Sequence, residues 1–301
     1  MEPGLAEFAR DRVRAAVGTG VRRVDPVPAE AGHSVLMVTL AGPPGTVVMK
    51  VAGRYARSDV DFDRTAAVSR LARAAGAPVA QVLAVDQSCR AGPWRYLIQE
   101  RVDGMEWRRV RSLLDAEQVE AAHQQIAQAV LAMQSVRFGS FGDLDAGGTP
   151  VGTDLLAALR HRAELHIASP DRLRLFRELL DSRAEWFGHA TESTLCHDDL
   201  HHANVIFRPR DDRWELAGIL DWDKAWAGPA ESDVARMDFW DDMTGPGFWA
   251  VYRAAVPAED GLHERTMIYQ LLWCLEYDAR TPRHEADTLR LCRLLGVRLP
   301  P

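Results

Sequence analysis

The segment LCHDDLHHANVIF (residues 195–207) gathers three histidines, two aspartates and an asparagine between apolar ends. Within it, His197, Asp199 and Asn204 match the H-x-D-x-x-x-x-N spacing of phosphoryl-transfer loops. In that chemistry the aspartate orients an acceptor hydroxyl and accepts its proton, while the asparagine holds magnesium on the nucleotide phosphates. A short loop that enters the apolar strand after Asn204 can present both side chains toward one point.

A further carboxylate follows one hairpin later. NVIFRP and RWELAGILDWD read as two strands joined by the turn RDD, so the chain returns to Asp221 beside the strand that begins at Asn204. Carboxylate and amide oxygens are ligands that magnesium accepts. We therefore predict Asn204 and Asp221 as magnesium ligands. The alternative is that Asp221 and Asp223 are turn residues that only close the hairpin.

The histidines of the same segment allow a competing interpretation as a zinc site. His197 and His201 are four residues apart, a usable zinc spacing on a helix, and His202 is adjacent. However, the segment has no H-E-x-x-H motif, and its apolar continuation indicates a loop that enters a strand. No separate cluster supplies a clear third ligand. A zinc-dependent hydrolase therefore stays an alternative to the phosphotransferase.

Lysine is rare in this chain: of 36 basic residues only Lys50 and Lys224 are lysines. Lys50 lies in VVMKV, an apolar strand where a lysine needs a partner, and the strand resembles the kinase V-A-I-K strand. We predict that Lys50 binds the α- and β-phosphates, although an exposed edge-strand lysine is the alternative. Gly32, His33 and Ser34, just before the preceding strand, could contact phosphate oxygens or form a plain turn. GPPGTVVMK lacks the G-K-[ST] ending of a P-loop, which excludes that class of NTPase.

These motifs together resemble those of the aminoglycoside phosphotransferase and choline-kinase-like small-molecule kinases. That family carries H-G-D-[LF]-H-x-x-N, a hairpin and I-D-[WFL]-x, and this chain has HDDLHHAN and ILDWDKAWAGPAESDVAR. The resemblance covers residues 32–236 and implies that Asp199 is the catalytic aspartate, with Asn204 and Asp221 on magnesium. The chain departs from the family at Asp198, where the family usually has glycine.

The resemblance also implies positions on the nucleotide side. Adenine would hydrogen-bond to the backbone of a hinge segment made of Glu100, Arg101 and Val102. The usual partner of the strand lysine is a glutamate on the following helix, and that position is Thr65 in this chain. Asp61, one turn earlier on the same helical face, is predicted to take its place.

The fold expected from these patterns is α+β, with two lobes like those of protein kinases. Residues 1–102 would form a nucleotide-binding lobe, an antiparallel sheet with one helix (59–76) between its strands. Its strands are expected at 33–40, 45–53, 78–86 and 94–104, after an initial helix at 5–18. Residues 103–301 would form a mainly helical catalytic and acceptor-binding lobe, with helices at 115–136, at 173–190 and from 239 onward. Asp115 with Gln118 resembles a capping box that begins the longest helix.

Acidic and aromatic residues after the magnesium loop are candidates for acceptor binding. Carboxylates could attract a cationic acceptor, and tryptophans could stack on it. Solvated helix faces and core tryptophans explain the same residues equally well. The candidates are Asp238, Trp240, Asp241, Asp242, Trp273 and Glu276.

Composition limits the remaining possibilities. A net charge of −7 over 301 residues argues against a nucleic-acid binder, and no apolar run is long enough to span a membrane. The start has no apolar signal core, and the four cysteines are scattered, so we expect a cytoplasmic monomer or homodimer. We expect an enzyme that uses Mg²⁺ and ATP or GTP to phosphorylate a hydroxyl of a small molecule, with an antibiotic as first candidate. A metabolite kinase for an amino alcohol or sugar is an alternative, as is a nucleotide-binding pseudokinase suggested by the missing helix glutamate.

Overall fold

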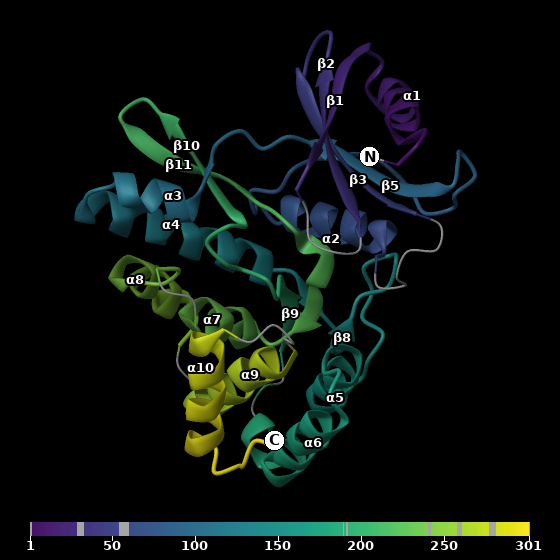
Figure 1. The fold of residues 1–301 in the computed structure, drawn as a ribbon. Coiled ribbons are helices and arrows are strands. Elements are labelled where there is room, and N and C mark those ends of the chain that lie inside the picture. The colour runs from purple at the N-terminus through teal and green to yellow at the C-terminus, as the bar shows by residue number, and fades with distance from the viewer. Residues whose placement is uncertain are drawn as a thin grey trace.

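The computed structural model describes residues 2–28, 33–53, 60–188, 190, 192–239, 242–257, 261–276 and 281–300. Figure 1 shows a sheet-containing N-terminal lobe above a mainly helical C-terminal lobe, and the chain crosses once from the first to the second. This is the α+β, two-lobed arrangement that the sequence predicts. The boundary between residues 102 and 103 stays a prediction. Among the described helices, none is long and apolar enough to cross a membrane.

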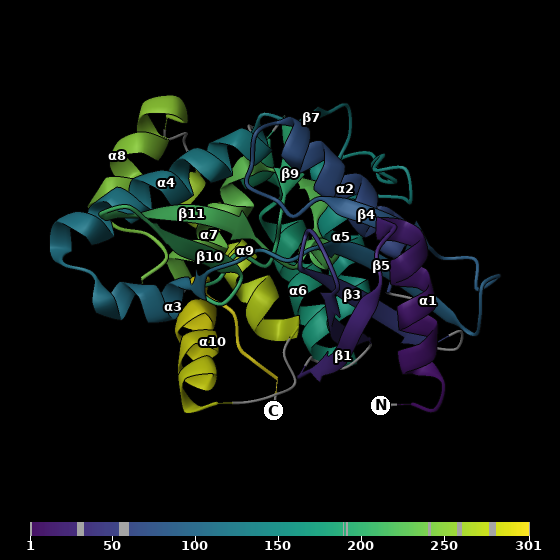
Figure 2. The ribbon, with the colours of Figure 1, turned by 90° about the horizontal axis from the view of Figure 1, so that it is seen from above.

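The N-terminal lobe is built on one antiparallel sheet with strand order β1-β2-β3-β5-β4. Helix α1 packs on one face of the sheet and helix α2 on the other, as the view from above shows (Figure 2). The bounds are α1 (Leu5–Val17), β1 (Val21–Val27), β2 (Ser34–Leu40), β3 (Thr46–Gly53), α2 (Phe62–Ala74), β4 (Val82–Asp86) and β5 (Trp94–Glu100).

Strand β3 separates the two faces of this sheet residue by residue. Val47, Met49 and Val51 are buried in the cluster that packs under α1. Because side chains alternate along a strand, Lys50 lies on the opposite face, toward α2 and the second lobe. The sequence alternation of β3 thus directs its one lysine into the space between the lobes.

The C-terminal lobe contains two small sheets, of order β11-β10-β6 and β7-β9-β12-β8, among helices. The strands are β6 (Met105–Glu106), β7 (Arg137–Phe138), β8 (Gly142–Asp143), β9 (Ser193–Cys196), β10 (Val205–Arg210), β11 (Arg213–Ile219) and β12 (Trp226–Gly228). The helices are α3 (Trp107–Val110), α4 (Ala116–Gln134), α5 (Leu155–His166), α6 (Pro170–Ser182), α7 (Ala230–Phe239), α8 (Pro246–Ala255), α9 (Leu262–Glu276) and α10 (Pro282–Leu294). Short 3₁₀ helices are η1 (Arg111–Leu113), η2 (Ala184–Phe187) and η3 (Trp222–Lys224).

The two small sheets fix both ends of the histidine-aspartate loop. β9 enters the loop at Cys196, and β10 leaves it at Val205. β12 pairs with β9, with Trp226 opposite Cys196, so η3 is brought back beside the loop. Leu200, Val205 and Phe207 belong to a hydrophobic cluster that lies under the loop and extends to residues of α2.

Several predicted elements are confirmed, and several elements of the structure were not predicted. The hairpins β2–β3 and β10–β11 form as expected, and α4 begins with the predicted capping box of Asp115 and Gln118. β1 (VRRVDPV) was missed because its charges and proline disguise an edge strand. α5 was also missed, and the strands β6, β7, β8 and β12 are too short to leave a periodic pattern.

Candidate active site

A buried carboxylate on α7 makes hydrogen bonds to the backbone of the loop 197–204. Asp233 on α7 accepts hydrogen bonds from the backbone N–H of His197 (2.8 Å) and of Asp198 (2.7 Å). Asp233 is fully buried, and burial raises its pKa to about 7. These two hydrogen bonds tie the start of the loop to α7.

His197 braces the loop and does not serve as a metal ligand here. Its Nε2 lies 2.9 Å from the carbonyl oxygen of Leu220, and its Nδ1 accepts the backbone N–H of Asp199 at 3.2 Å. Burial lowers the pKa of His197, so the ring is neutral, with its proton on Nε2 toward Leu220. Among the described residues, no group of three or more histidines, cysteines or carboxylates could hold a metal ion. Both ring nitrogens of His197 are engaged by backbone groups, which argues against this histidine as a zinc ligand.

Asp199 is buried and lies between two cationic side chains. Arg236 Nη2 donates to Asp199 Oδ1 at 2.8 Å, and Lys224 Nζ lies 3.5 Å from Oδ2. Burial alone would raise the pKa of Asp199, but Arg236 and Lys224 outweigh it and lower the pKa. Asp199 is therefore a carboxylate at neutral pH, and its Oδ2 has the weaker contact of the two oxygens.

Asn204 and Asp221 offer oxygens at adjoining ends of the hairpin, just before β10 and just after β11. Asn204 Nδ2 donates to the carbonyl oxygen of Asp199 (3.0 Å), which leaves its Oδ1 as an acceptor for a cation. The backbone N–H of Leu220 donates to the carbonyl of Asn204 (2.8 Å), which aligns the ends of β10 and β11. Asp221 follows in a left-handed conformation with φ 67°. An amide oxygen and a carboxylate suit magnesium, so this donor set fits the ion predicted from the sequence.

Lys50 makes ion pairs with two carboxylates of the C-terminal lobe. Its Nζ lies 2.7 Å from Asp221 Oδ1 and 2.8 Å from Asp223 Oδ2, and the residue is buried. Burial would lower the pKa of Lys50, but Asp223 and Asp221 raise it, so the amine stays charged. The Asp61 carboxylate instead accepts the backbone N–H of Arg64 (3.0 Å) and caps α2. The pairing of Lys50 with Asp61 that the sequence suggests is not the one in the structure.

A cavity between the lobes begins at Lys50 and Asp221. It continues along apolar and amide side chains of both lobes, and its lining residues are Lys50, Thr65, Ser69, Val79, Ala80, Gln99, Ile219, Leu220, Asp221 and Trp222. This cavity brings together the strand lysine and Asp221, one of the two predicted magnesium ligands, whereas Asn204 is not among its lining residues.

The other residues predicted on the nucleotide side, as far as the structure describes them, are not among those that line this cavity. The pKa of His33 is lowered by burial and by Lys50, which places the ring near the lysine, while Ser34 opens β2 and is exposed. Glu100 ends β5 and Val102 packs against Gly218 of β11, whereas Arg101 pairs with Asp103 at 3.2 Å. Gly32 lies outside the described residues.

On the opposite side of the loop, Asp198 connects two arginines. Its backbone is left-handed (φ 58°), and its carboxylate makes ion pairs with Arg162 on α5 and, at 3.8 Å, with Arg236 on α7. Arg162 also pairs with Asp143 and stacks over Trp226. Opposite charges therefore alternate through one chain of ion pairs that ends at the partly exposed Lys224: Asp143, Arg162, Asp198, Arg236, Asp199 and Lys224.

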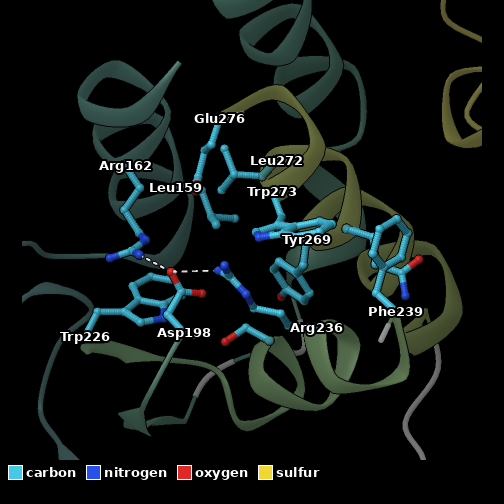
Figure 3. Close-up of a pocket in the computed structure, with 12 residues that line it drawn as sticks. Leu159, Arg162, Asp198, Trp226, Arg236, Phe239, Tyr269, Leu272, Trp273 and Glu276 are labelled. Atoms are coloured by element: carbon cyan, nitrogen blue, oxygen red, sulfur yellow. Dashed lines mark hydrogen bonds and ion pairs between the residues drawn. The ribbon is translucent and has the colours of Figure 1, made fainter. Parts of the chain in front are cut away.

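Figure 3 shows a pocket over this chain, with Asp198 joined to Arg162 and Arg236 on one side and Glu276 and Trp273 of α9 on the other. Burial and then the charge of Asp198 raise the pKa of Glu276 to about 7. Apolar and aromatic side chains complete the wall, namely Leu159, Trp226, Phe239, Tyr269 and Leu272.

The predicted acceptor residues divide into two groups. Trp273 and Glu276 line the pocket. Asp238 is exposed and accepts the Thr244 hydroxyl at 3.2 Å, and Asp242 pairs with Arg111 at 2.6 Å. Trp240 and Asp241 lie outside the described residues. Sequence reasoning missed Thr65, Arg162, Lys224 and Arg236 as site residues, although the scarcity of lysine could have drawn attention to Lys224.

Comparisons with known proteins agree with this arrangement. A family model of the phosphotransferase enzyme family matches residues 25–266. The structure is similar to a candidate aminoglycoside phosphotransferase from Ralstonia eutropha JMP134, with TM-score 0.64 and 14% identity over 96% of this chain and 95% of that one. It is also similar to spectinomycin phosphotransferase in complex with ADP and spectinomycin, with TM-score 0.55 and 11% identity over 98% of each chain. No curated protein matches the chain.

At these identities the two structures show the fold, and they confirm its kinase-like class. The family model covers most of the chain, from before the Lys50 strand to helix α9. Its span includes both the loop 197–204 and Asp221, which carried the resemblance seen in the sequence. The chain therefore belongs to the phosphotransferase enzyme family and is a small-molecule kinase.

Proposed function

We propose that the chain transfers the γ-phosphoryl group of ATP or GTP to a hydroxyl of a small molecule, with an antibiotic as the acceptor. The observation that carries this proposal is the buried, ionised carboxylate of Asp199 beside Asn204 and the Lys50–Asp221 pair. Lys50 comes from β3 of the first lobe, whereas Asp199, Asn204 and Asp221 come from the segments around β10 and β11 of the second. Phosphoryl transfer needs this arrangement, because its catalysis consists mainly of positioning and charge neutralisation.

Each residue has a defined part in the proposed reaction. The acceptor hydroxyl donates a hydrogen bond to Asp199 Oδ2, while Arg236 fixes Oδ1. As the acceptor oxygen bonds to the γ-phosphorus, the bond to the leaving nucleoside diphosphate breaks and the hydroxyl proton passes to Asp199. Lys50 binds the α- and β-phosphates. A bound magnesium ion, held by Asn204 and Asp221, would neutralise charge on the phosphates.

The donor nucleotide is proposed to occupy the cavity between the lobes. Val79, Ala80 and Ile219 provide apolar contacts for a base, and Lys50 lies at the end where phosphates would bind. Backbone groups of the segment 100–102 are the proposed hydrogen-bonding partners of the base. Spectinomycin phosphotransferase has been solved with ADP, which supports ATP as the first donor to test. Because this donor is a cytoplasmic nucleotide, we propose a cytoplasmic location.

The acceptor is proposed to enter the pocket formed by α5, α7 and α9. That pocket begins at Asp198, the neighbour of Asp199, and Glu276 and Trp273 line its far side. One structural relative is named for aminoglycosides and one for spectinomycin, which supports hydroxylated antibiotics as first acceptors. Amino alcohols and sugars fit the same chemistry and belong in the same test.

The experiment measures ADP and GDP release by the purified protein with Mg²⁺ across hydroxylated antibiotics, amino alcohols and sugars. Mass spectrometry then locates the phosphate on the product. We expect Asp199→Ala to lower turnover about 100- to 10,000-fold, because the proton acceptor is lost, while ADP affinity is retained. Asp181→Asn on the exposed face of α6 is the matched control and should leave turnover unchanged.

Other outcomes would point elsewhere. Wild-type turnover in Asp199→Ala would remove Asp199 from its assigned role. Nucleotide binding without transfer to any acceptor would favour the pseudokinase alternative. Turnover that needs no nucleotide and is abolished by removal of stoichiometric zinc would favour the hydrolase.

A further inference from the structure

The lysine of the phosphate site takes its carboxylate partners from the opposite lobe. In kinases this lysine pairs with a glutamate on the helix that follows its strand, within one lobe. Here the corresponding helix position is Thr65, and both carboxylates on Lys50 Nζ belong to the segment after β11. One of the two, Asp221, is the proposed magnesium ligand, so Asp223 is the carboxylate left to the lysine.

Helix α2 nevertheless contributes to this pair through Asp223. The Thr65 hydroxyl lies 2.8 Å from Asp223 Oδ1, and Arg64 Nη2 donates to the carbonyl oxygen of Asp223 at 2.9 Å. Thr65 and Lys50 are both buried, and the other carboxylate oxygen of Asp223 faces Lys50. α2 thus provides no carboxylate of its own to Lys50. Instead, the Thr65 hydroxyl on α2 makes a hydrogen bond to Asp223, a carboxylate from the second lobe.

We propose that Asp223, held by a hydrogen bond to Thr65, is the positioning residue for Lys50 and replaces the missing helix glutamate. The three side chains form one continuous set of contacts, from α2 through Asp223 to β3. Asp223 contacts Lys50 and no proposed reacting atom, so it acts through the lysine. The inference rests on the proposed nucleotide binding and names the residue that aligns its lysine.

A consequence is that alignment of the lysine depends on the relative position of the lobes. Thr65, Arg64 and Lys50 belong to the N-terminal lobe, whereas Asp223 lies in η3, which the pairing of β12 with β9 holds beside the loop 197–204. Separation of the lobes would remove the partner of Lys50 in the same movement. The proposed phosphate binding by Lys50 is therefore coupled to the contact between the two lobes.

The test measures two quantities in each variant: ADP affinity by calorimetry in EDTA, where no magnesium contributes, and steady-state kcat and KM for ATP. For Asp223→Asn we expect ADP affinity and kcat each to fall about 10- to 100-fold, by analogy with the loss of residues that orient metal ligands. Thr65→Val keeps the shape of the side chain and removes only the hydroxyl. It should change both quantities in the same direction by a smaller factor.

Rebuilding the helix carboxylate is the decisive variant. Thr65→Glu combined with Asp223→Asn places the acid on α2, and we expect it to regain at least half of the lost ADP affinity on a logarithmic scale. Thr65→Glu alone opposes two carboxylates and should not improve on wild type. If the double variant does not fold, Thr65→Val and Asp223→Asn still decide the matter, with the melting temperature showing that each is folded.

Two controls on the same helix separate the possibilities. Asp63→Asn is a matched change on α2 outside these contacts, and Asp61→Asn removes the helix cap. Both should keep wild-type ADP affinity and kcat. The inference is overturned if Asp223→Asn keeps wild-type values, or if Asp61→Asn loses them while Asp223→Asn does not. Failure of the wild-type protein to bind ADP with or without Mg²⁺ would instead overturn the proposed function.

Discussion

At the scale of the residue, Asp198 is where the chain departs from its family's glycine. The position needs a left-handed backbone (φ 58°), which glycine adopts freely and aspartate at a cost of about 1 kcal/mol. In return, its carboxylate is shared by Arg162 and Arg236. Both arginine side chains are buried, so loss of that carboxylate would leave cationic charge poorly compensated.

We therefore predict that Asp198→Gly destabilises the protein although it restores the family sequence. Breaking a buried ion pair by removing one partner costs about 3–5 kcal/mol, which exceeds the backbone gain of about 1 kcal/mol. Asp211→Gly is the matched control, because Asp211 is also left-handed (φ 53°) but lies exposed in the turn between β10 and β11. Urea unfolding should show the first variant weakened and the second unchanged or slightly stabilised. Stabilisation by Asp198→Gly would contradict this account of the ion pairs.

At the scale of the element, the connection from β5 to β6 passes close to β10. Gly104 in this connection has φ 149°, and a Cβ there would lie 2.4 Å from the carbonyl oxygen of Phe207. That oxygen belongs to a strand backbone, which cannot turn aside as a flexible side chain could. Glycine at this position therefore allows the lobe connection to pack against the hairpin that carries Asn204.

Gly104→Ala is accordingly predicted to destabilise the protein by about 1–3 kcal/mol, through overpacking and an unfavourable φ. Gly139→Ala is the control, because no atom lies within 4 Å of a Cβ built there. Thermal unfolding of the two variants side by side measures the difference. Equal melting temperatures would show that the connection shifts without cost.

Local elements of the fold could be predicted from the sequence, whereas contacts between distant residues could not. The hairpins around Lys50 and Asn204 were predictable, because apolar alternation and turn residues are local signals. The partner of Lys50 was not, because the Thr65–Asp223 contact joins residues 158 positions apart and depends on how the lobes meet. The role of Arg162 could not be predicted for the same reason. An arginine on a helix shows no distinctive sequence pattern, and only the fold places Asp198 beside it.

At the scale of the whole molecule, stability should depend on pH through buried carboxyl groups. Burial and the charge of Asp198 raise the pKa of Glu276 from 4.5 to about 7 in the folded protein. Because the pKa of Glu276 is higher in the folded than in the unfolded chain, the stability that the protonated Glu276 contributes is fully present below pH 4.5. It is lost as the pH rises through about 7. The folded state therefore becomes less stable across that window, relative to a chain with a neutral residue at this position.

Glu276→Gln is predicted to remove this loss. Its unfolding free energy should match wild type near pH 4.5 and exceed it progressively toward pH 8. Glu285→Gln serves as the control, because Glu285 is exposed near the start of α10. Urea titrations at a series of pH values measure the difference. A gap between Glu276→Gln and wild type that does not change with pH would rule out titration of Glu276 as its source.

The distribution of lysine has a practical consequence for handling the protein. The two lysines of the chain both lie at the proposed site, Lys50 buried on its carboxylates and Lys224 with 38% of its side chain exposed beside Asp199. Amine-directed reagents used for fluorescent labelling or immobilisation will therefore find, apart from the chain terminus, only site residues. A surface rich in arginine offers such reagents no other lysine, so among the side chains Lys224, next to the carboxylate proposed to accept the hydroxyl proton, will be modified before the buried Lys50.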